Sequence, residues 1–349
     1  PDLRILRSWF RFFFFCVLQF HWISDWESSA ALHDFSLGAK SIAIPRRSLL
    51  TIPPAAAQNY THQLATTPCR DIVFLKMMKC GSTTMLHLLK QVVSRCSQAG
   101  TPIQFVQGEK SIAQLQGNLR RKRHSAALIT LVREPLSRQI SHYHQCRFPK
   151  EMGPCSKPAK RGPKEFFSSS LWHINNLQAT FMGWTPSNKR SAKDLVSQFD
   201  FIIVRERYNE GVCLLYLKGF ATVRDILYFS YKNRTKENTK FTEEVLELAR
   251  KKSAMDQEVY TEAVRQFDAT AAPFRAILPQ CVATFERTND QVLKHCRHLY
   301  NTMGTNKKQE AKIVACFDDF CRSDEACRNN ALVPQDSTTQ STALSATQR

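Results

Sequence analysis

The sequence lacks the short signatures by which zinc-binding and nucleic-acid-binding modules are recognised. Twelve cysteines occur among 349 residues, yet no two of them form a Cys-x-x-Cys pair. Cys and His residues do not occur at zinc-finger spacing, and an aromatic strand of the kind found in RNA-recognition modules is missing. These absences exclude a zinc finger and disfavour a nucleic acid as the partner.

The cysteines are therefore expected to form disulfides rather than a metal site. Twelve is a large number for a cytosolic enzyme of this size. Spacing alone does not define which cysteines pair. One group near the C-terminal end has an odd number of members, so at least one member must pair elsewhere or stay unbridged. The members of this group are Cys281, Cys296, Cys316, Cys321 and Cys327.

The N-terminal apolar run is shorter than the roughly 20 residues that span a bilayer. It extends from Phe12 to Ile23 and follows three basic residues, Arg4, Arg7 and Arg11. A basic flank followed by an apolar stretch is typical of targeting segments. We predict a secretory signal or a signal-anchor over residues 1–24; a buried helix is the alternative.

Shifts in composition divide the rest of the chain. Residues 25–69 show no sustained hydrophobic period, which suits a stem between an anchor and a folded domain. Residues 70–328 contain the apolar segments expected of one folded domain. Residues 329–349 are rich in Ser, Thr and Gln and are expected to be disordered.

Positive charge predominates over the whole chain. Lys and Arg number 49 against 30 for Asp and Glu, which gives a formal net charge of +19. Such an excess predicts an anionic partner, which can be a nucleic acid, an anionic lipid, a nucleotide or an acidic polysaccharide. The sign of the charge does not choose among them.

Short apolar runs of strand length alternate with segments of helical spacing. Strands followed by helices in this order predict a parallel sheet covered by helices on both faces, a three-layer α/β fold. The predicted strands are 71–76, 126–132, 199–204 and 225–229. The predicted helices are 82–93, 135–146, 208–220, 242–252, 256–267 and 290–300.

Residues 76–84 form a loop between the first predicted strand and its helix. Backbone N–H groups at a helix start attract an anion. Gly81 permits close approach of a ligand, and Ser82, Thr83 and Thr84 add hydroxyl groups. The loop is not a Walker A motif, because Lys79 precedes the glycine rather than following it. A P-loop kinase is therefore disfavoured.

A lysine ahead of a Gly-Ser-Thr turn suits the transfer of a sulfuryl group. Negative charge builds on the bridging oxygen as the S–O bond breaks, and a fixed cation such as Lys79 stabilises it. The geometry resembles in-line phosphoryl transfer. Because a sulfuryl group carries less charge than a phosphoryl group, we expect no metal ion. The alternative is a plain turn that joins a strand to a helix.

Two segments resemble one enzyme family. Residues 72–84 resemble the 5'-phosphosulfate loop of the galactose 3-O-sulfotransferases and the heparan sulfate and uronyl 2-O-sulfotransferases. Residues 131–143 are similar to the 3'-phosphate motif of the same family, an Arg-acid-Pro turn followed by a serine: here Arg133-Glu134-Pro135 and Ser141. The resemblance covers residues 70–300, roughly.

The resemblance implies a P-loop-like sulfotransferase fold that uses 3'-phosphoadenosine 5'-phosphosulfate (PAPS) as donor. It implies a lumenal catalytic domain in a single-pass type II protein of the Golgi membrane, with which the glycosylation sequons at Asn59 and Asn233 are compatible. The acceptor would be a galactose or uronic acid hydroxyl on a glycolipid, glycoprotein or polysaccharide. The implied donor-binding residues are Lys76, Lys79, Cys80, Gly81, Ser82, Thr83, Thr84, Arg133 and Ser141.

The acceptor hydroxyl needs a general base, and here the sequence departs from the family. The His-Gly-His run of the 2-O-sulfotransferases is absent. Glu109 lies near the expected place, so we predict Glu109 as the catalytic base beside the catalytic Lys79; His124 is the alternative. Asn175, Asn176 and Gln178 occur where relatives contribute acceptor-pocket residues.

Two other functions stay open from the sequence. A non-catalytic, basic glycan-binding protein needs only the positive surface. A P-loop kinase needs a Gly-Lys pair, which is missing. The enzyme hypothesis alone predicts that Lys79, Arg133 and Ser141 lie together around one nucleotide.

Overall fold

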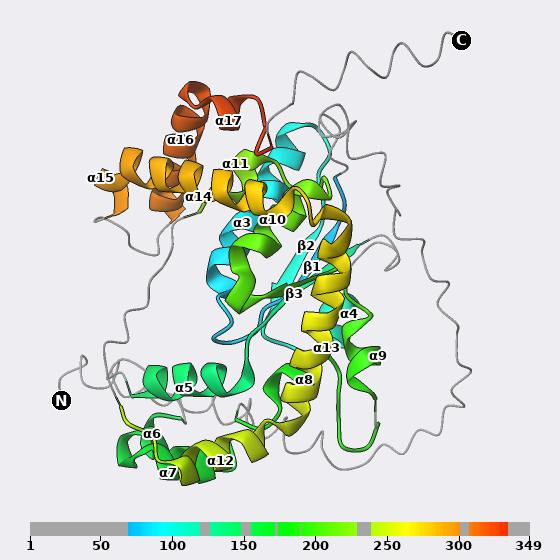
Figure 1. Ribbon diagram of the computed structural model, residues 1–349, viewed down its shortest axis with the longest axis vertical. Coiled ribbons are helices and arrows are strands. Elements are labelled where there is room, and N and C mark those ends of the chain that lie inside the picture. Colours follow the sequence, from blue (N-terminus) through cyan, green and yellow to red (C-terminus); the bar gives the residue numbers. More distant parts are fainter. Residues whose placement is uncertain are drawn as a thin grey trace, which may run out of the picture. The chain divides into compact units, whose positions relative to one another are not determined.

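The computed structural model describes residues 69–118, 126–147, 155–171, 174–188, 190–228, 239–300 and 307–333 (Figure 1). The predicted segment 1–24, nearly all of the stem, both sequons, His124 and the end of the tail lie outside these residues. No helix within the described ranges is long and apolar enough to cross a membrane.

The centre of the described chain is a sheet of four parallel strands in the order β2-β1-β3-β4. Every residue of β1 and β4 is buried, as expected where helices cover both faces of a parallel sheet. The predicted α/β class with a parallel sheet flanked by helices is confirmed. The strands are β1 (Ile72–Leu75), β2 (Phe105–Gly108), β3 (Ala127–Val132) and β4 (Phe201–Val204).

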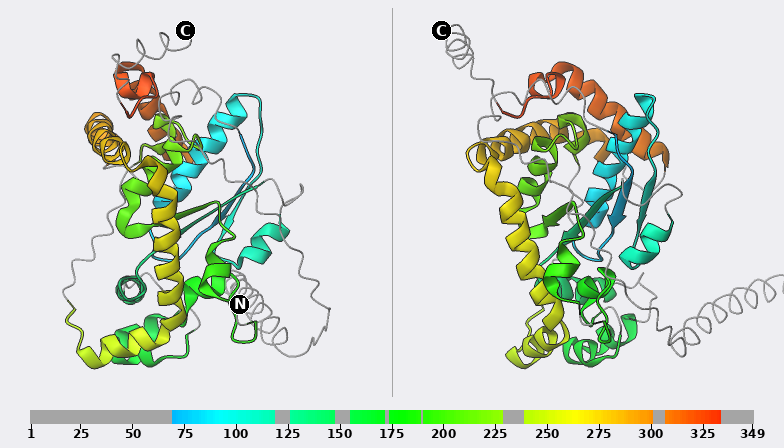
Figure 2. Two further views of the ribbon diagram at one scale, coloured as in Figure 1. Left: turned by 45° about the vertical axis from the view of Figure 1, so that its right-hand side comes forward. Right: turned by 90° about the vertical axis from the view of Figure 1, so that its right-hand side faces the viewer.

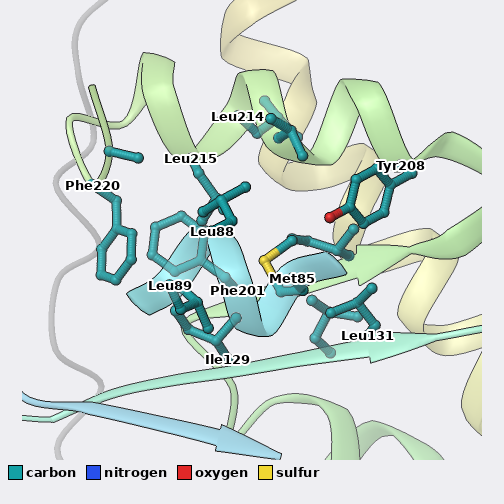
Figure 3. Close-up of a cluster of buried hydrophobic side chains, with 14 of the residues drawn as sticks. Met85, Leu88, Leu89, Ile129, Leu131, Phe201, Tyr208, Leu214, Leu215 and Phe220 are labelled. Atoms are coloured by element: carbon teal, nitrogen blue, oxygen red, sulfur yellow. The ribbon is translucent and has the colours of Figure 1, made fainter. Parts of the chain in front are cut away.

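The predicted helices after the first three apolar strands are confirmed. They are α3 (Ser82–Gln98), α5 (Pro135–Cys146) and α10 (Tyr208–Leu217). Side chains of α3 and α10 pack together against β3 in one buried cluster, in which Met85 lies near Leu131 (Figure 3). This packing fixes the start of α3 relative to the ends of the strands.

The predicted strand 225–229 is wrong. Residues Val223–Ile226 form the short helix α11, because Thr222 and Asp225 cap it reciprocally through side chain and backbone. Asp225 is also buried and ion-paired with Arg95 of α3, 2.6 Å away. The remaining strand of the sheet is β2, an edge strand that is only partly buried.

The other helices follow the predicted order with shifted bounds. Helix α14 begins 12 residues before the predicted 290, since the structure has it at Leu278–His295. The further helices are α4 (Ile112–Gly117), α6 (Ser156–Arg161), α7 (Pro163–Ser168), α8 (Leu177–Phe181), α9 (Ala192–Val196), α12 (Glu243–Lys252), α13 (Ala254–Ala271), α15 (Arg297–Tyr300), α16 (Lys307–Ser323) and α17 (Glu325–Arg328). Helix α5 packs with α6 and α12, and α7 joins this group through α6 and α12 (Figure 2).

Four disulfides confirm the predicted use of the cysteines. They join Cys69 to Cys96, Cys146 to Cys155, Cys296 to Cys316 and Cys321 to Cys327. Cys281 of the odd C-terminal group stays unbridged, as do Cys80 and Cys213 among the described cysteines.

The packed chain continues beyond residue 328. The hydroxyl of Tyr216 donates to the carbonyl oxygen of Asn330 at 2.8 Å and accepts from the backbone N–H of Leu332 at 3.2 Å. Leu332 is fully buried. The first residues of the predicted tail therefore belong to the folded domain.

Candidate functional site

The four parallel strands bring charged residues together at the carboxyl edge of the sheet. Lys76 follows β1, Glu109 follows β2, Arg133 follows β3 and Arg205 follows β4. In open parallel sheets this edge is where ligands bind. Three of these four side chains are cationic, which suits an anionic ligand.

The loop after β1 has the backbone geometry of an anion-binding concavity. Lys79 and Gly81 have positive φ angles of 64° and 84°, while the intervening Cys80 does not. Alternation of this kind turns successive N–H groups toward one point. Helix α3 then begins with Gly81 as N-cap and without a side-chain cap. Its first N–H groups are therefore available to a ligand.

The loop side chains divide into outward and inward groups. Thr83 is exposed and Thr84 half-buried. Ser82 is buried, and its hydroxyl donates to the carbonyl oxygen of Met77 at 2.8 Å. Ser82 therefore offers a ligand its backbone N–H, because its hydroxyl proton is already used inside the loop.

Cys80 is also turned inward. Burial raises the pKa of its thiol to about 12, so the group is neutral at physiological pH. The thiol donates to Oε1 of Gln178 at 3.6 Å. The side chain of Cys80 therefore packs in the protein interior.

Arg133 joins the two sequence motifs. Its Nη1 donates to the carbonyl oxygen of Lys79 at 3.0 Å. Burial lowers the pKa of Arg133, and the nearby positive charge of Arg205 acts in the same direction. An arginine keeps its proton in proteins even so, so two cations stand close together beside the loop.

Gln178 holds the backbone of Arg133 in place. Its Oε1 accepts the N–H of Arg133 at 2.9 Å and its Nε2 donates to the carbonyl oxygen of Arg133 at 2.9 Å. Gln178 is fully buried. The expectation that it lies in an acceptor pocket is therefore wrong, because no exposed surface of this side chain remains for a sugar.

Asn176 is likewise structural. Its Oδ1 accepts the backbone N–H groups of Met255 at 2.9 Å and Asp256 at 3.3 Å, which ties α8 to the start of α13. A side-chain oxygen used in this way is not available as a specific contact to an acceptor. Asn176 and Gln178 thus have structural contacts in place of the acceptor contacts that the family resemblance suggested.

The second motif supplies a helix that is already capped. The carboxylate of Glu134 accepts the N–H groups of Leu136 at 2.9 Å and Ser137 at 2.6 Å. Ser141 lies half-buried further along α5. Within the described ranges no hydrogen bond joins Ser141 to the loop, and the two motifs are joined through Arg133 and Lys79.

Glu109 and Lys76 form an ion pair across the ends of two neighbouring strands. Their Oε1 and Nζ atoms are 3.0 Å apart, and the side chains are 38% and 27% exposed. The carboxylate is thus held at the edge of the site and still accessible to solvent. Such a position is compatible with a general base, and it gives Lys76 a partner of its own.

The histidines of the second motif are packing residues. His142 and His144 are buried, and Nε2 of His142 lies 3.4 Å from Sγ of Cys146. His142, Cys146 and Cys155 have their ligand atoms within 4.8 Å of one another. A bridge between the two cysteines, however, uses both sulfur atoms.

A buried ion pair underlies the site. Arg138 of α5 and Asp256 of α13 are both fully buried, with Nη2 and Oδ2 3.7 Å apart. Oδ1 of Asp256 also accepts the N–H of Ala179 at 2.9 Å, at the start of α8. Burial raises the pKa of Asp256 to about 6, although Arg138 opposes this shift. The pair connects the helix of the second motif to the helix that carries Gln178.

Sequence reasoning missed Arg205 and the Arg138–Asp256 pair, and it gave Gln178 a different role from the one that the structure shows. The position of Arg205 could have been predicted from the sequence, since it follows an apolar strand directly, just as Lys76 and Arg133 do. The roles of the other three depend on contacts between elements that are far apart in the sequence.

Replacement of Gly81 by alanine is expected to destabilise the fold and displace Arg205. A β-carbon there would lie 2.8 Å from Nε of Arg205, at a φ angle of +84°. Gly100→Ala is a matched control, because its φ angle is +74° and nothing lies within 4 Å. We expect Gly81→Ala to cost at least about 1 kcal/mol in urea unfolding and more than the control. Equal costs would show that the contact with Arg205 contributes nothing.

Comparison with known proteins adds no family to these observations. No protein-family model, no curated protein and no solved structure matches the chain.

Proposed function

We propose that this chain transfers a sulfuryl group from PAPS to a hydroxyl group of a glycan. The hydrogen bond from Arg133 to the carbonyl oxygen of Lys79 carries the proposal, because it unites the two motifs at the carboxyl edge of the sheet. A basic glycan-binding surface requires no such convergence.

The residues at this edge fit a donor with two anionic groups. The loop 79–84, with its paired left-handed residues and its uncapped helix start, suits a phosphosulfate. Arg133 suits a phosphate, because a guanidinium presents parallel N–H donors to its oxygen atoms. In this proposal Arg133 and Ser141 hold the 3'-phosphate, and PAPS supplies an activated sulfuryl group.

Lys79 and Glu109 have complementary roles in the proposed transfer. The bond between sulfur and the bridging phosphate oxygen breaks while the acceptor oxygen forms a bond to sulfur. Lys79 balances the charge that develops on the leaving phosphate. Glu109 accepts the proton of the acceptor hydroxyl, a contribution of roughly 10² to 10⁴ in rate. The ion pair with Lys76 orients the carboxylate of Glu109.

The disulfides support a lumenal location for this activity. Four bridges among the described cysteines are typical of oxidising compartments. We accordingly place the enzyme in the Golgi lumen, attached to the membrane by its N-terminal segment, with a galactose or uronic acid residue as acceptor.

Binding of adenosine 3',5'-bisphosphate, the donor without its sulfuryl group, tests the proposal. We expect the full chain to bind it in titration calorimetry and Arg133→Met to weaken binding by about 10- to 100-fold, since hydrogen bonds to charged groups contribute about 1.5–3 kcal/mol. Arg275→Met removes an exposed charge and is the control. Equal affinity of wild type and Arg133→Met, or no binding at all, would contradict the proposal.

A further inference from the structure

Arg205 lies against the loop that follows β1. It is the residue directly after β4, and its Nε and Cδ would lie 2.8 and 2.9 Å from a β-carbon on Gly81. Its guanidinium carbon is also 5.6 Å from the ring centre of the buried Tyr208. The aliphatic stem is thus packed at the N-cap of α3, while the side chain as a whole is exposed.

No carboxylate in the described ranges pairs with Arg205. Arg207, two residues later, forms ion pairs with both Glu210 and Asp268. Glu206, which follows Arg205 in the chain, also has other partners. The carboxylate of Glu206 accepts from the N–H of Glu134 and the hydroxyl of Tyr260, both at 3.2 Å.

Arg205 also lies close enough to Arg133 to affect its pKa. The positive charge of Arg205 helps to lower the pKa of Arg133, after the larger effect of burial. Two guanidinium groups repel each other unless an anion lies between or beside them. The carboxylates of Glu206 and Glu134 oppose the effect of Arg205 on Arg133, and a bound anion would offset the repulsion between the two guanidinium groups further.

We propose that Arg205 binds the 5' anionic group of the donor nucleotide and so makes a charged 5' group a requirement for binding. This inference rests on the proposed function. The 5' group is assigned because Arg205 packs on Gly81, within the loop that would hold the phosphosulfate. Arg133 contacts this loop through the carbonyl oxygen of Lys79. In the proposed function it binds the 3'-phosphate.

Binding of two nucleotides distinguishes a contact with the 5' group from a contact with the 3'-phosphate. Adenosine 3',5'-bisphosphate carries both charged groups, whereas adenosine 3'-monophosphate lacks the 5' group. We expect Arg205→Met to weaken calorimetric binding of the bisphosphate by about 10- to 100-fold and to leave binding of the monophosphate unchanged. Arg205→Lys should restore part of the affinity, and Arg275→Met should bind both nucleotides as the wild type does.

The outcomes distinguish this inference from the function on which it rests. Equal affinity of Arg205→Met and wild type for the bisphosphate would overturn the role of Arg205 alone. An equal loss for both nucleotides would also overturn it, since Arg205 would then act on the whole site. Failure of the wild-type chain to bind the bisphosphate would contradict the proposed function and, with it, the role of Arg205.

Discussion

Replacement of Lys79 by alanine is expected to lower kcat for sulfuryl transfer by about 10²- to 10³-fold, the usual cost of removing one group that stabilises developing charge. Lys79 is held at a φ angle of 64°, and its carbonyl oxygen accepts from Arg133. The backbone that carries the side chain is therefore held in place at the loop. Alanine keeps a β-carbon in the same backbone conformation, so the change removes the charge with little effect on the loop.

Two further variants show whether the charge at residue 79 is the cause. Lys79→Arg keeps the positive charge and should retain more activity than Lys79→Ala. Lys90→Ala removes an exposed lysine from α3 and should leave kcat unchanged. A Lys79→Ala enzyme with wild-type kcat would exclude Lys79 from the chemical step.

Replacement of Arg138 by methionine is expected to have the largest effect on stability. Both members of the Arg138–Asp256 pair are fully buried. Removal of one partner leaves a buried charge without its counter-charge, which costs about 3–5 kcal/mol in the free energy of unfolding. The double variant Arg138→Met with Asp256→Asn should recover much of this loss, because no buried charge remains.

The cost of Arg138→Met should depend on pH. In the wild type, burial raises the pKa of Asp256 to about 6, so the folded state binds a proton more tightly than the unfolded state. Its contribution to stability therefore falls as the pH rises from about 4 to 6. Loss of Arg138 raises this pKa further, so the variant continues to lose stability above pH 6. Urea unfolding should show a larger cost at pH 7.5 than at pH 5; an equal cost at both would contradict the assigned charge state.

The sequence was sufficient to predict the sheet where strands are continuously apolar. Residues 72–75, 127–132 and 201–204 are such runs, and each is followed by a helix of clear apolar period. Strand β2 was missed because an edge strand is only partly buried and needs no apolar run. Residues 225–229 were predicted as a strand, but reciprocal capping by Thr222 and Asp225 makes Val223–Ile226 helical.

The candidate site was predictable only in its local parts. The loop 76–84 and Arg133 were found because strand, loop and helix follow one another in the chain. Gln178 was placed with the acceptor, since nothing in its neighbourhood indicates that it pairs with the backbone of a residue 45 positions away. The ion pair of Lys76 with Glu109 depends in the same way on the pairing of β1 with β2.

The most direct measurement is transfer of labelled sulfate from PAPS by the full chain to a panel of glycans with galactose and uronic acid residues. We expect the wild type to label at least one acceptor and Lys79→Ala to label it at about one hundredth of the wild-type rate or less. No labelled acceptor with the wild type, together with no binding of adenosine 3',5'-bisphosphate, would contradict the proposed sulfotransferase function.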